Sequence, residues 1–173
     1  MEAIAIEPLG NEPATVDRLA EILVSTVAAG GSVHFMDPVS FGAAQAYWRD
    51  ALAEAEAGRS VLFGGFVGER LAGTVTLFLD TPPNQPFRAE IRKLMVAPAE
   101  RGRGIARALM LEAERSAAAR GRTLLTLDTA IEGGAAGLYE QLGWVLAGTI
   151  PDYAYKPKGG LVGTAIYYKR IGL

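Results

Sequence analysis

The stretch from Ala89 to Thr129 places the strongest constraint on how this chain folds. "AEIRKLMVAP" predicts an extended segment that Pro98 ends, and "TLLTLDT" at 123–129 predicts a second one. Between them, residues 104–120 repeat apolar side chains at helical spacing, on a face formed by Ile105, Leu109, Ala113 and Ala117. A strand, a helix and a strand in this order predict a parallel βαβ crossover.

The N-terminal half predicts two helices and a hairpin. Thr15 is the expected N-cap of an amphipathic helix at 15–27, and Ser40 is the expected cap of a second helix at 41–58. A β-hairpin is expected at 60–80, with its turn at Gly68–Arg70. The second helix is expected to bury Phe41, Trp48, Leu52 and Ala55.

The C-terminal part predicts a short helix at 133–143, then strands at 144–150 and 164–171 joined by a loop at 151–160. No repeat or linker interrupts the chain, so we expect residues 1–173 to form a single domain. The order of elements predicts an α/β fold, in which a central twisted mixed β-sheet of about six or seven strands is flanked by helices on both faces.

Composition removes several kinds of chemistry. The chain has no cysteine and a single histidine, His34, so disulfides, thiolate catalysis and cysteine-ligated metals are excluded and we expect no metal site. The net charge of −2 argues against nucleic-acid binding, because phosphates require a surplus of Lys and Arg. No apolar run approaches the roughly 20 residues that span a bilayer. We therefore expect a cytoplasmic protein without a membrane partner.

The segment "ERGRGIARAL" from Glu100 to Leu109 places two glycines and three arginines at the start of the central helix. A glycine-rich turn at a helix N-terminus is suited to bind phosphate. A P-loop is excluded because no Gly-Lys-Ser or Gly-Lys-Thr occurs. A Rossmann site is disfavoured, although Asp128 follows Gly104 by 24 residues. Arg107 stands where the third glycine would be, and a spacer separates the glycines from the preceding strand.

A third pattern fits the segment: arginine, two residues, glycine, one residue and alanine, at Arg101, Gly104 and Ala106. This pattern resembles the pyrophosphate-binding motif of the GNAT superfamily of acyl-CoA-dependent N-acyltransferases. "LYEQLGW" at Leu138–Trp144 resembles the second signature of that superfamily. The alternative is that the glycines simply end a loop before a helix. "RAEIRKLMV", "LLTLDT" and "TAIYYKR" further resemble the tabtoxin-resistance type of acetyltransferase, and this resemblance runs through nearly the whole chain.

The resemblance implies acetyl-CoA as the co-substrate. It implies that its pyrophosphate binds at the arginine and glycine turn, and that the strand backbone at 94–96 binds the pantetheine arm and the oxyanion of the reaction. The residues implied in cofactor binding are Leu94, Met95, Val96, Arg101, Gly102, Arg103, Gly104, Ile105 and Ala106. Many family members have an asparagine seven residues before the signature tyrosine, where this chain has Glu132. The contact to the outer end of the pantetheine arm therefore stays open.

The resemblance also implies direct attack of an amine on the thioester. Glu90 and Asp128 align with a pair of carboxylates that remove the amine proton, and Tyr139 aligns with a phenol that protonates the leaving thiolate. Each has a structural alternative: Glu90 can pair with Arg92, Asp128 can cap the following turn through Thr129, and Tyr139 can be a buried aromatic. Which carboxylate is the principal base stays open.

The expected acceptor is the amine of a small molecule: a toxin, an antibiotic or an amino-acid derivative. A protein or peptide acetyltransferase, which needs an open groove, and a non-catalytic CoA-binding sensor are the alternatives. The loop "GGSVHFMDP" at 30–38 is a candidate lid over the acceptor. Candidate lining or core residues are Tyr47, Trp48, Tyr153 and Tyr155. Dimers are frequent in the superfamily, so a homodimer is a further expectation.

Overall fold

The computed structural model describes residues 3–172. Over this range the chain forms one seven-stranded sheet in the order β1-β2-β3-β4-β5-β7-β6. The strands are β1 (Ile4–Pro8), β2 (Ser60–Val67), β3 (Arg70–Phe78), β4 (Arg88–Val96), β5 (Leu124–Ala130), β6 (Val145–Tyr155) and β7 (Leu161–Arg170). Of the neighbouring pairs in this range, β4 and β5 are parallel and the others are antiparallel. The expected α/β fold with a mixed sheet is confirmed.

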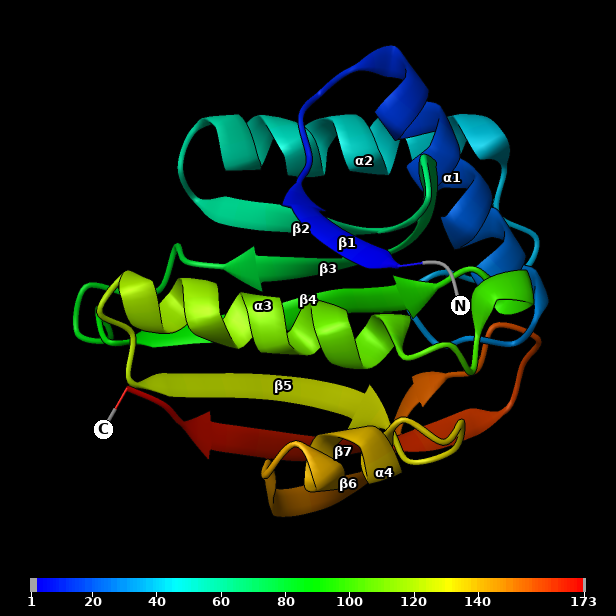
Figure 1. Ribbon diagram of the computed structural model, residues 1–173. Helices are drawn as coiled ribbons and strands as arrows, with labels where there is room; N and C mark the ends of the chain where they lie inside the picture. Colours follow the sequence, from blue (N-terminus) through cyan, green and yellow to red (C-terminus); the bar gives the residue numbers. More distant parts are fainter. Residues whose placement is uncertain (1–2, 173) are drawn as a thin grey trace.

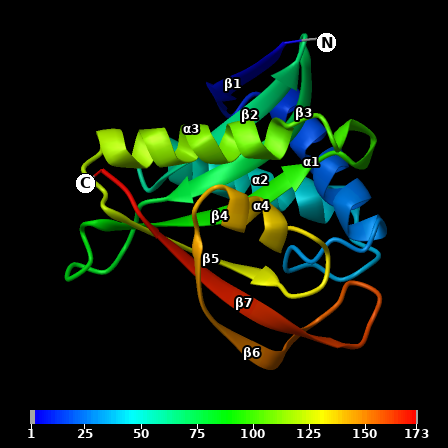
Figure 2. The ribbon, with the colours of Figure 1, turned by 60° about the horizontal axis from the view of Figure 1, so that its bottom comes forward.

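Helices cover both faces of this sheet (Figures 1 and 2). The helices are α1 (Pro13–Ala28), α2 (Phe41–Glu56), α3 (Ile105–Ala119) and α4 (Ala136–Gln141), with a short 3-10 helix at Pro98–Glu100. α1 and α2 enclose one buried cluster against the sheet, whereas α3 and α4 enclose the other. Leu62 and Phe63, neighbours on β2, enter different clusters because side chains alternate across a strand.

Several local expectations are confirmed. The Ser40 hydroxyl accepts a 3.1 Å hydrogen bond from the Ala43 N–H, which caps the first turn of α2. The hairpin turns between Val67 and Arg70, as expected. α3 buries the stripe read from its spacing, formed by Ile105, Leu109, Ala113 and Ala117.

Other local expectations are wrong. α1 begins at Pro13, with Glu12 as its N-cap and Thr15 inside its first turn, because proline has the φ of a helix and lacks the N–H that a first turn leaves unpaired. Phe41 is 43% exposed, since the buried face of α2 starts only at Ala44.

Both edge strands of the sheet, β1 and β6, contain residues that the sequence pattern did not predict to be extended. β1, which the sequence pattern did not predict, pairs antiparallel with β2. Residues 151–155 belong to β6 and not to the expected loop: beyond an irregularity in register after Ile150, Ala154 and Tyr155 pair with Val162 and Leu161 on β7. β1 depends on a partner that is distant in sequence, and local patterns do not report such a partner. The end of β6 pairs instead with the start of β7, its neighbour in sequence, so the connection between the two strands is shorter than expected.

β4 and β5 separate after a short parallel pairing. Arg88–Glu90 lies opposite Leu124–Thr126, whereas β4 continues to Val96 and β5 to Ala130 (Figures 1 and 2). On its other side, β4 carries one extra residue between Arg92 and Met95, where β3 has only Val75 between the partners of these two. A β-bulge of this kind bends its strand. The bulge therefore accounts for the direction in which β4 leaves β5.

Trp48 and Phe41 give a matched test of the α2 packing, because the sequence pattern predicts both to face inward. Trp48 is fully buried, so we expect Trp48→Ala to lower the free energy of unfolding by about 3–5 kcal/mol. Phe41→Ala should change it by less than about 1 kcal/mol, since exposed positions contribute little. Urea denaturation followed by circular dichroism measures both values. Equal losses would contradict the observed orientation of α2.

Candidate active site

A cavity of about 700 Å³ lies where β4 and β5 diverge. One wall is the β4 segment 94–96, another is the turn before α3, and a third is formed by residues 129–135 with Tyr139. The predicted cofactor residues that line it are Leu94, Met95, Val96, Arg101, Gly102, Gly104, Ile105 and Ala106. Arg103 is not part of the lining; its guanidinium pairs with Glu100. The structure thus brings the predicted set together, apart from the Arg103 side chain.

The turn before α3 has the backbone of an anion-binding turn. Gly102 and Gly104 have φ angles of +75° and +85°, which favour glycine. Gly104 is the N-cap of α3 and provides no side-chain acceptor, so the first N–H groups of the helix are left for another acceptor. Glu100, which is almost fully buried, pairs with Arg70 and Arg103 and ties the turn to β3.

A second cavity, of about 400 Å³, adjoins the first. Its lining includes the three predicted catalytic residues: Glu90, Asp128 and Tyr139. Ser32, Val33, Leu94, Thr129 and Tyr139 line both cavities. The structure therefore joins a long cleft to a smaller pocket at the side chains of Leu94 and Tyr139.

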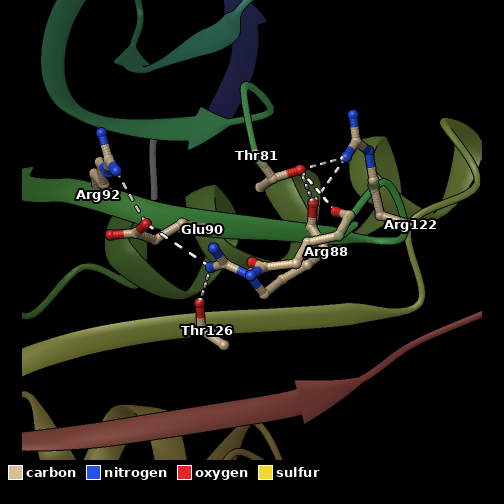
Figure 3. Close-up of polar contacts among 7 residues, drawn as sticks. Thr81, Arg88, Glu90, Arg92, Arg122 and Thr126 are labelled. Carbon is tan, nitrogen blue, oxygen red and sulfur yellow. Dashed lines mark hydrogen bonds and ion pairs between the residues drawn. The ribbon is translucent and has the colours of Figure 1, made fainter. Parts of the chain in front are cut away.

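Glu90 lies on β4 between two guanidinium groups (Figure 3). Its carboxylate is 3.0 Å from Arg92 Nη2 and 4.0 Å from Arg88 Nη1. Arg88 also donates a 3.0 Å hydrogen bond to the Thr126 hydroxyl on β5, across the last part of the parallel pairing. The ion pair with Arg92 that the sequence offered as an alternative is therefore present, and Glu90 lines the pocket at the same time.

Asp128 lies on β5, beyond the last residue that pairs with β4. Its carboxylate accepts a 3.4 Å hydrogen bond from the Thr164 hydroxyl on β7, and its side chain lines the pocket. Among residues 3–172, Asp128 forms no ion pair. It thus differs from Glu90, whose charge is already paired.

Tyr139, on α4, is 6% exposed and packs beside the rings of Trp144 and Tyr167, at centroid distances of 6.2 and 5.7 Å. Burial, with the nearby Asp128 and Tyr167, raises the pKa of the Tyr139 phenol to about 12. The phenol is therefore protonated at neutral pH. The buried-aromatic interpretation and the cavity-lining one both hold for this residue.

Sequence reasoning missed Lys93. This residue lies at the β4 bulge with φ of +52°, and its Nζ is 2.8 Å from His34 Nδ1 in the α1–α2 loop. Both side chains line the 400 Å³ pocket together with Tyr47. A lysine in the middle of a predicted strand could have drawn attention to this position. Its role, however, depends on the contact with His34, which lies 59 residues away in the sequence.

The remaining residues that the sequence offered as pocket-lining candidates fall in the core, on the surface and in the cavities. Trp48 is core, and Tyr155 is 65% exposed. Tyr153 lines a small pocket with His34 and Asp128. Glu132 lines the larger cavity and pairs with Lys156 at 3.1 Å.

Residues 3–172 contain neither a metal-binding cluster nor a membrane-spanning helix. No group of three or more His, Asp or Glu side chains is placed to hold a metal ion. In the same part of the chain, no helix has the length and apolar character needed to cross a membrane.

A family model places the chain in the class of acetyltransferases. The chain belongs to the acetyltransferase (GNAT) family, whose model matches residues 33–144. This match contains the β4 bulge, the turn before α3, and Tyr139. The protein is therefore an N-acetyltransferase.

Solved structures share this fold over nearly the whole chain. An N-acetyltransferase from Staphylococcus aureus Mu50 is 18% identical, with a TM-score of 0.82 over 97% of this chain and 98% of its own. A putative acetyltransferase from Salmonella typhimurium, solved with acetyl-CoA, is 17% identical, with a TM-score of 0.79 over 97% and 94%. A putative phosphinothricin N-acetyltransferase is 19% identical, with a TM-score of 0.78 over 97% and 98%. At this identity the likeness establishes the fold.

We expect Gly104→Ala to weaken acetyl-CoA binding about 10-fold, because a left-handed backbone costs a residue with a Cβ about 1–2 kcal/mol. We expect the turn to relieve this strain by rotating its N–H groups away from the cavity. Titration calorimetry with acetyl-CoA measures the dissociation constant.

Gly68→Ala is the matched control. Gly68 has φ of +60° in the β2–β3 turn, and an added Cβ has no neighbour within 4 Å at either glycine. Gly68→Ala should lower stability in a similar way and leave acetyl-CoA binding unchanged. Loss of affinity in both variants, or in neither, would argue against a role for the Gly104 turn.

Proposed function

We propose that this protein transfers the acetyl group of acetyl-CoA to the amine of a small molecule, as a single domain. The observation that carries the proposal is the junction of the two cavities. The larger one has the extent and the backbone donors for the cofactor, whereas the smaller one gathers two carboxylates around a pocket of about 400 Å³. Tyr139 stands where they meet.

The residues at hand fit acetyl-CoA. The 94–96 segment of β4 faces the opening where β5 has ended its pairing, so its backbone is available to a bound pantetheine arm. The glycine turn, with the first N–H groups of α3, fits a pyrophosphate. When bound, acetyl-CoA supplies an activated acetyl group that an amine nitrogen takes over, with release of the CoA thiol.

The shape of the pocket supports a small acceptor. Residues 32–34 from the α1–α2 loop and Tyr47 from α2 line it together with β4. A pocket of about 400 Å³ with walls from three elements favours a small amine over a protein segment, which requires an open groove. Toxins, antibiotics and amino-acid derivatives of the kind handled by tabtoxin-resistance acetyltransferases are the acceptors that we propose.

Asp128 is the proposed principal base. An acceptor ammonium must lose a proton before its nitrogen can attack. The Asp128 carboxylate is exposed to the pocket and its charge is unpaired, whereas Glu90 is held by Arg92 at 3.0 Å. In this assignment Glu90 holds the Arg92 guanidinium in place. Asp128 removes the proton, directly or through water.

Tyr139 is the proposed acid. Its phenol lies between the two cavities and stays protonated at neutral pH, because its pKa is raised to about 12. A proton from this hydroxyl neutralises the leaving sulfur. The same burial that raises the pKa also fixes the ring against Trp144 and Tyr167.

A thiol-release assay tests the proposed function. The chain has no cysteine, so a thiol reagent reports only the CoA that is set free. Acetyl-CoA binding is first measured by calorimetry, and a panel of small amines, aminoglycosides and peptides is then screened for thiol release. Failure to bind acetyl-CoA, or release with peptides alone, would overturn the proposal.

Tyr139→Phe should lower kcat about 100-fold, the usual contribution of general acid catalysis, while KM for acetyl-CoA stays the same. Tyr167→Phe is the control, because Tyr167 is equally buried and adjacent to Tyr139 but outside the lining of both cavities. It should keep kcat within a few-fold. Unchanged turnover in Tyr139→Phe would remove the phenol from the mechanism.

Asp128→Asn should lower kcat/KM for the amine about 100-fold at neutral pH, and Glu90→Gln should lower it less. The Asp128→Asn defect should shrink as the pH rises toward the pKa of the amine, since more of the acceptor is then already neutral. Rate profiles against pH for both variants check this. The reverse order of the two defects would assign the base to Glu90.

A further inference from the structure

The acceptor pocket contains a cation that the proposed reaction does not use. Lys93 Nζ lies 2.8 Å from His34 Nδ1 and 5.6 Å from the centre of the Tyr47 ring. Among residues 3–172, no carboxylate forms an ion pair with Lys93. A lysine that is half-buried without a carboxylate partner is costly, because its charge is partly removed from water. An anion in the pocket would offset this cost.

Lys93 differs from Arg92, the other cation that lines the pocket, in having no carboxylate partner among residues 3–172. Arg92 is committed to Glu90 at 3.0 Å, and its guanidinium lies over the Phe78 ring at 3.6 Å. With that pair neutralised, Lys93 and Asp128 are the two unpaired charges left in the lining. They are of opposite sign and do not pair with one another. A ligand that carries both a cation and an anion complements them.

His34 supports Lys93 as a donor. A charged lysine has only N–H groups, so Lys93 must donate the hydrogen bond and His34 Nδ1 must accept it. Burial, and then the charge of Lys93, lower the pKa of His34, which keeps the imidazole neutral and able to accept. Lys93 has further N–H groups to direct at a ligand.

We propose that Lys93, held by His34, is a binding site for an anionic group on the acceptor. The proposal rests on the proposed function and deepens it. The acceptor is an amine with an oxyanion a short distance away, such as an aminocarboxylate or an aminophosphonate, with its amine beside Asp128. Simple monoamines and polyamines are poor acceptors, because they leave Lys93 without a partner or place a second cation against it.

The charge state of Lys93 fits this role. Burial and the neighbouring Arg92 lower the pKa of Lys93 to about 8, against the opposing effect of Asp128 and Glu90. His34 from the loop, Tyr47 from α2 and Tyr139 from α4 also line the pocket. Lys93 is thus a cation at neutral pH and loses its charge as the pH rises through about 8. Binding of the anion should weaken over the same interval.

Matched acceptors test the site. L-α-amino acids, their methyl esters and their decarboxylated amines are compared by thiol release, with aminophosphonates as a second oxyanion. We expect kcat/KM to favour the acid over the ester by about 10-fold or more, the effect of one hydrogen bond to a charged group. The acid and the ester also differ in the intrinsic reactivity of their amines, which is measured as the acid-to-ester ratio of their uncatalysed rates with acetyl-CoA. In Lys93→Met the acid-to-ester ratio of kcat/KM should fall close to this uncatalysed ratio.

Lys93→Arg provides the conservative control. Arginine keeps its charge at all accessible pH values, so this variant should retain a preference for the acid but lose its decline above about pH 8, the pKa of the lysine it replaces. A wild-type preference that is absent, or that survives unchanged in Lys93→Met, would overturn the anion site. Either result would leave the acetyl transfer itself standing.

A labelling experiment tests the site without turnover. N,N,N-trimethylglycine has a carboxylate and a fixed cation but no amine that could be acetylated, and its methyl ester has the cation alone. Acetic anhydride labelling of Lys93, read by mass spectrometry against the exposed Lys158, should slow several-fold with the acid and remain unchanged with the ester. Protection would support the anion site even if no amine were turned over. Equal labelling with both compounds would contradict it.

Discussion

The early separation of β4 from β5 is the constraint on which the rest of the site depends. Parallel strands normally exchange hydrogen bonds along their whole shared length, but here the pairing stops at Glu90 and Thr126. The extra residue in β4 bends the strand on its β3 side. What results is a sheet with an opening in its middle. Backbone groups, rather than side chains, then form one wall of the larger cavity.

The same bulge sets the electrostatics of the pocket. It places two consecutive cations, Arg92 and Lys93, in the pocket lining, where regular alternation would send them to opposite faces. Arg92 neutralises Glu90, and Lys93 is left with a neutral imidazole. One backbone irregularity thus opens the larger cavity and separates the two unpaired charges, Lys93 and Asp128. Tyr139, on α4, lines both cavities.

The structural features that the sequence predicted correctly depend on short-range interactions. The α3 stripe, the Ser40 cap and the hairpin turn were predictable, because each depends on residues within a few positions of one another. β1 was not, since its partner β2 lies far from it in the sequence. The second half of β6 was assigned to a loop, although its partner at the start of β7 is near in sequence. The exposure of Phe41 depends on where α2 meets the sheet, which its own periodicity does not contain.

The sequence by itself determined the α/β class and the glycine turn at 102–104, because helical and strand periodicity and short motifs are local. The candidate residues Glu90, Asp128 and Tyr139 came from the resemblance of the sequence to an acetyltransferase family. Only the tertiary structure decided that these three line one pocket and that this pocket meets the larger cavity at Tyr139. It also decided which carboxylate is paired and brought His34 to Lys93. Charge pairing and burial are set by groups far apart in the chain, and these groups meet only when the sheet is assembled.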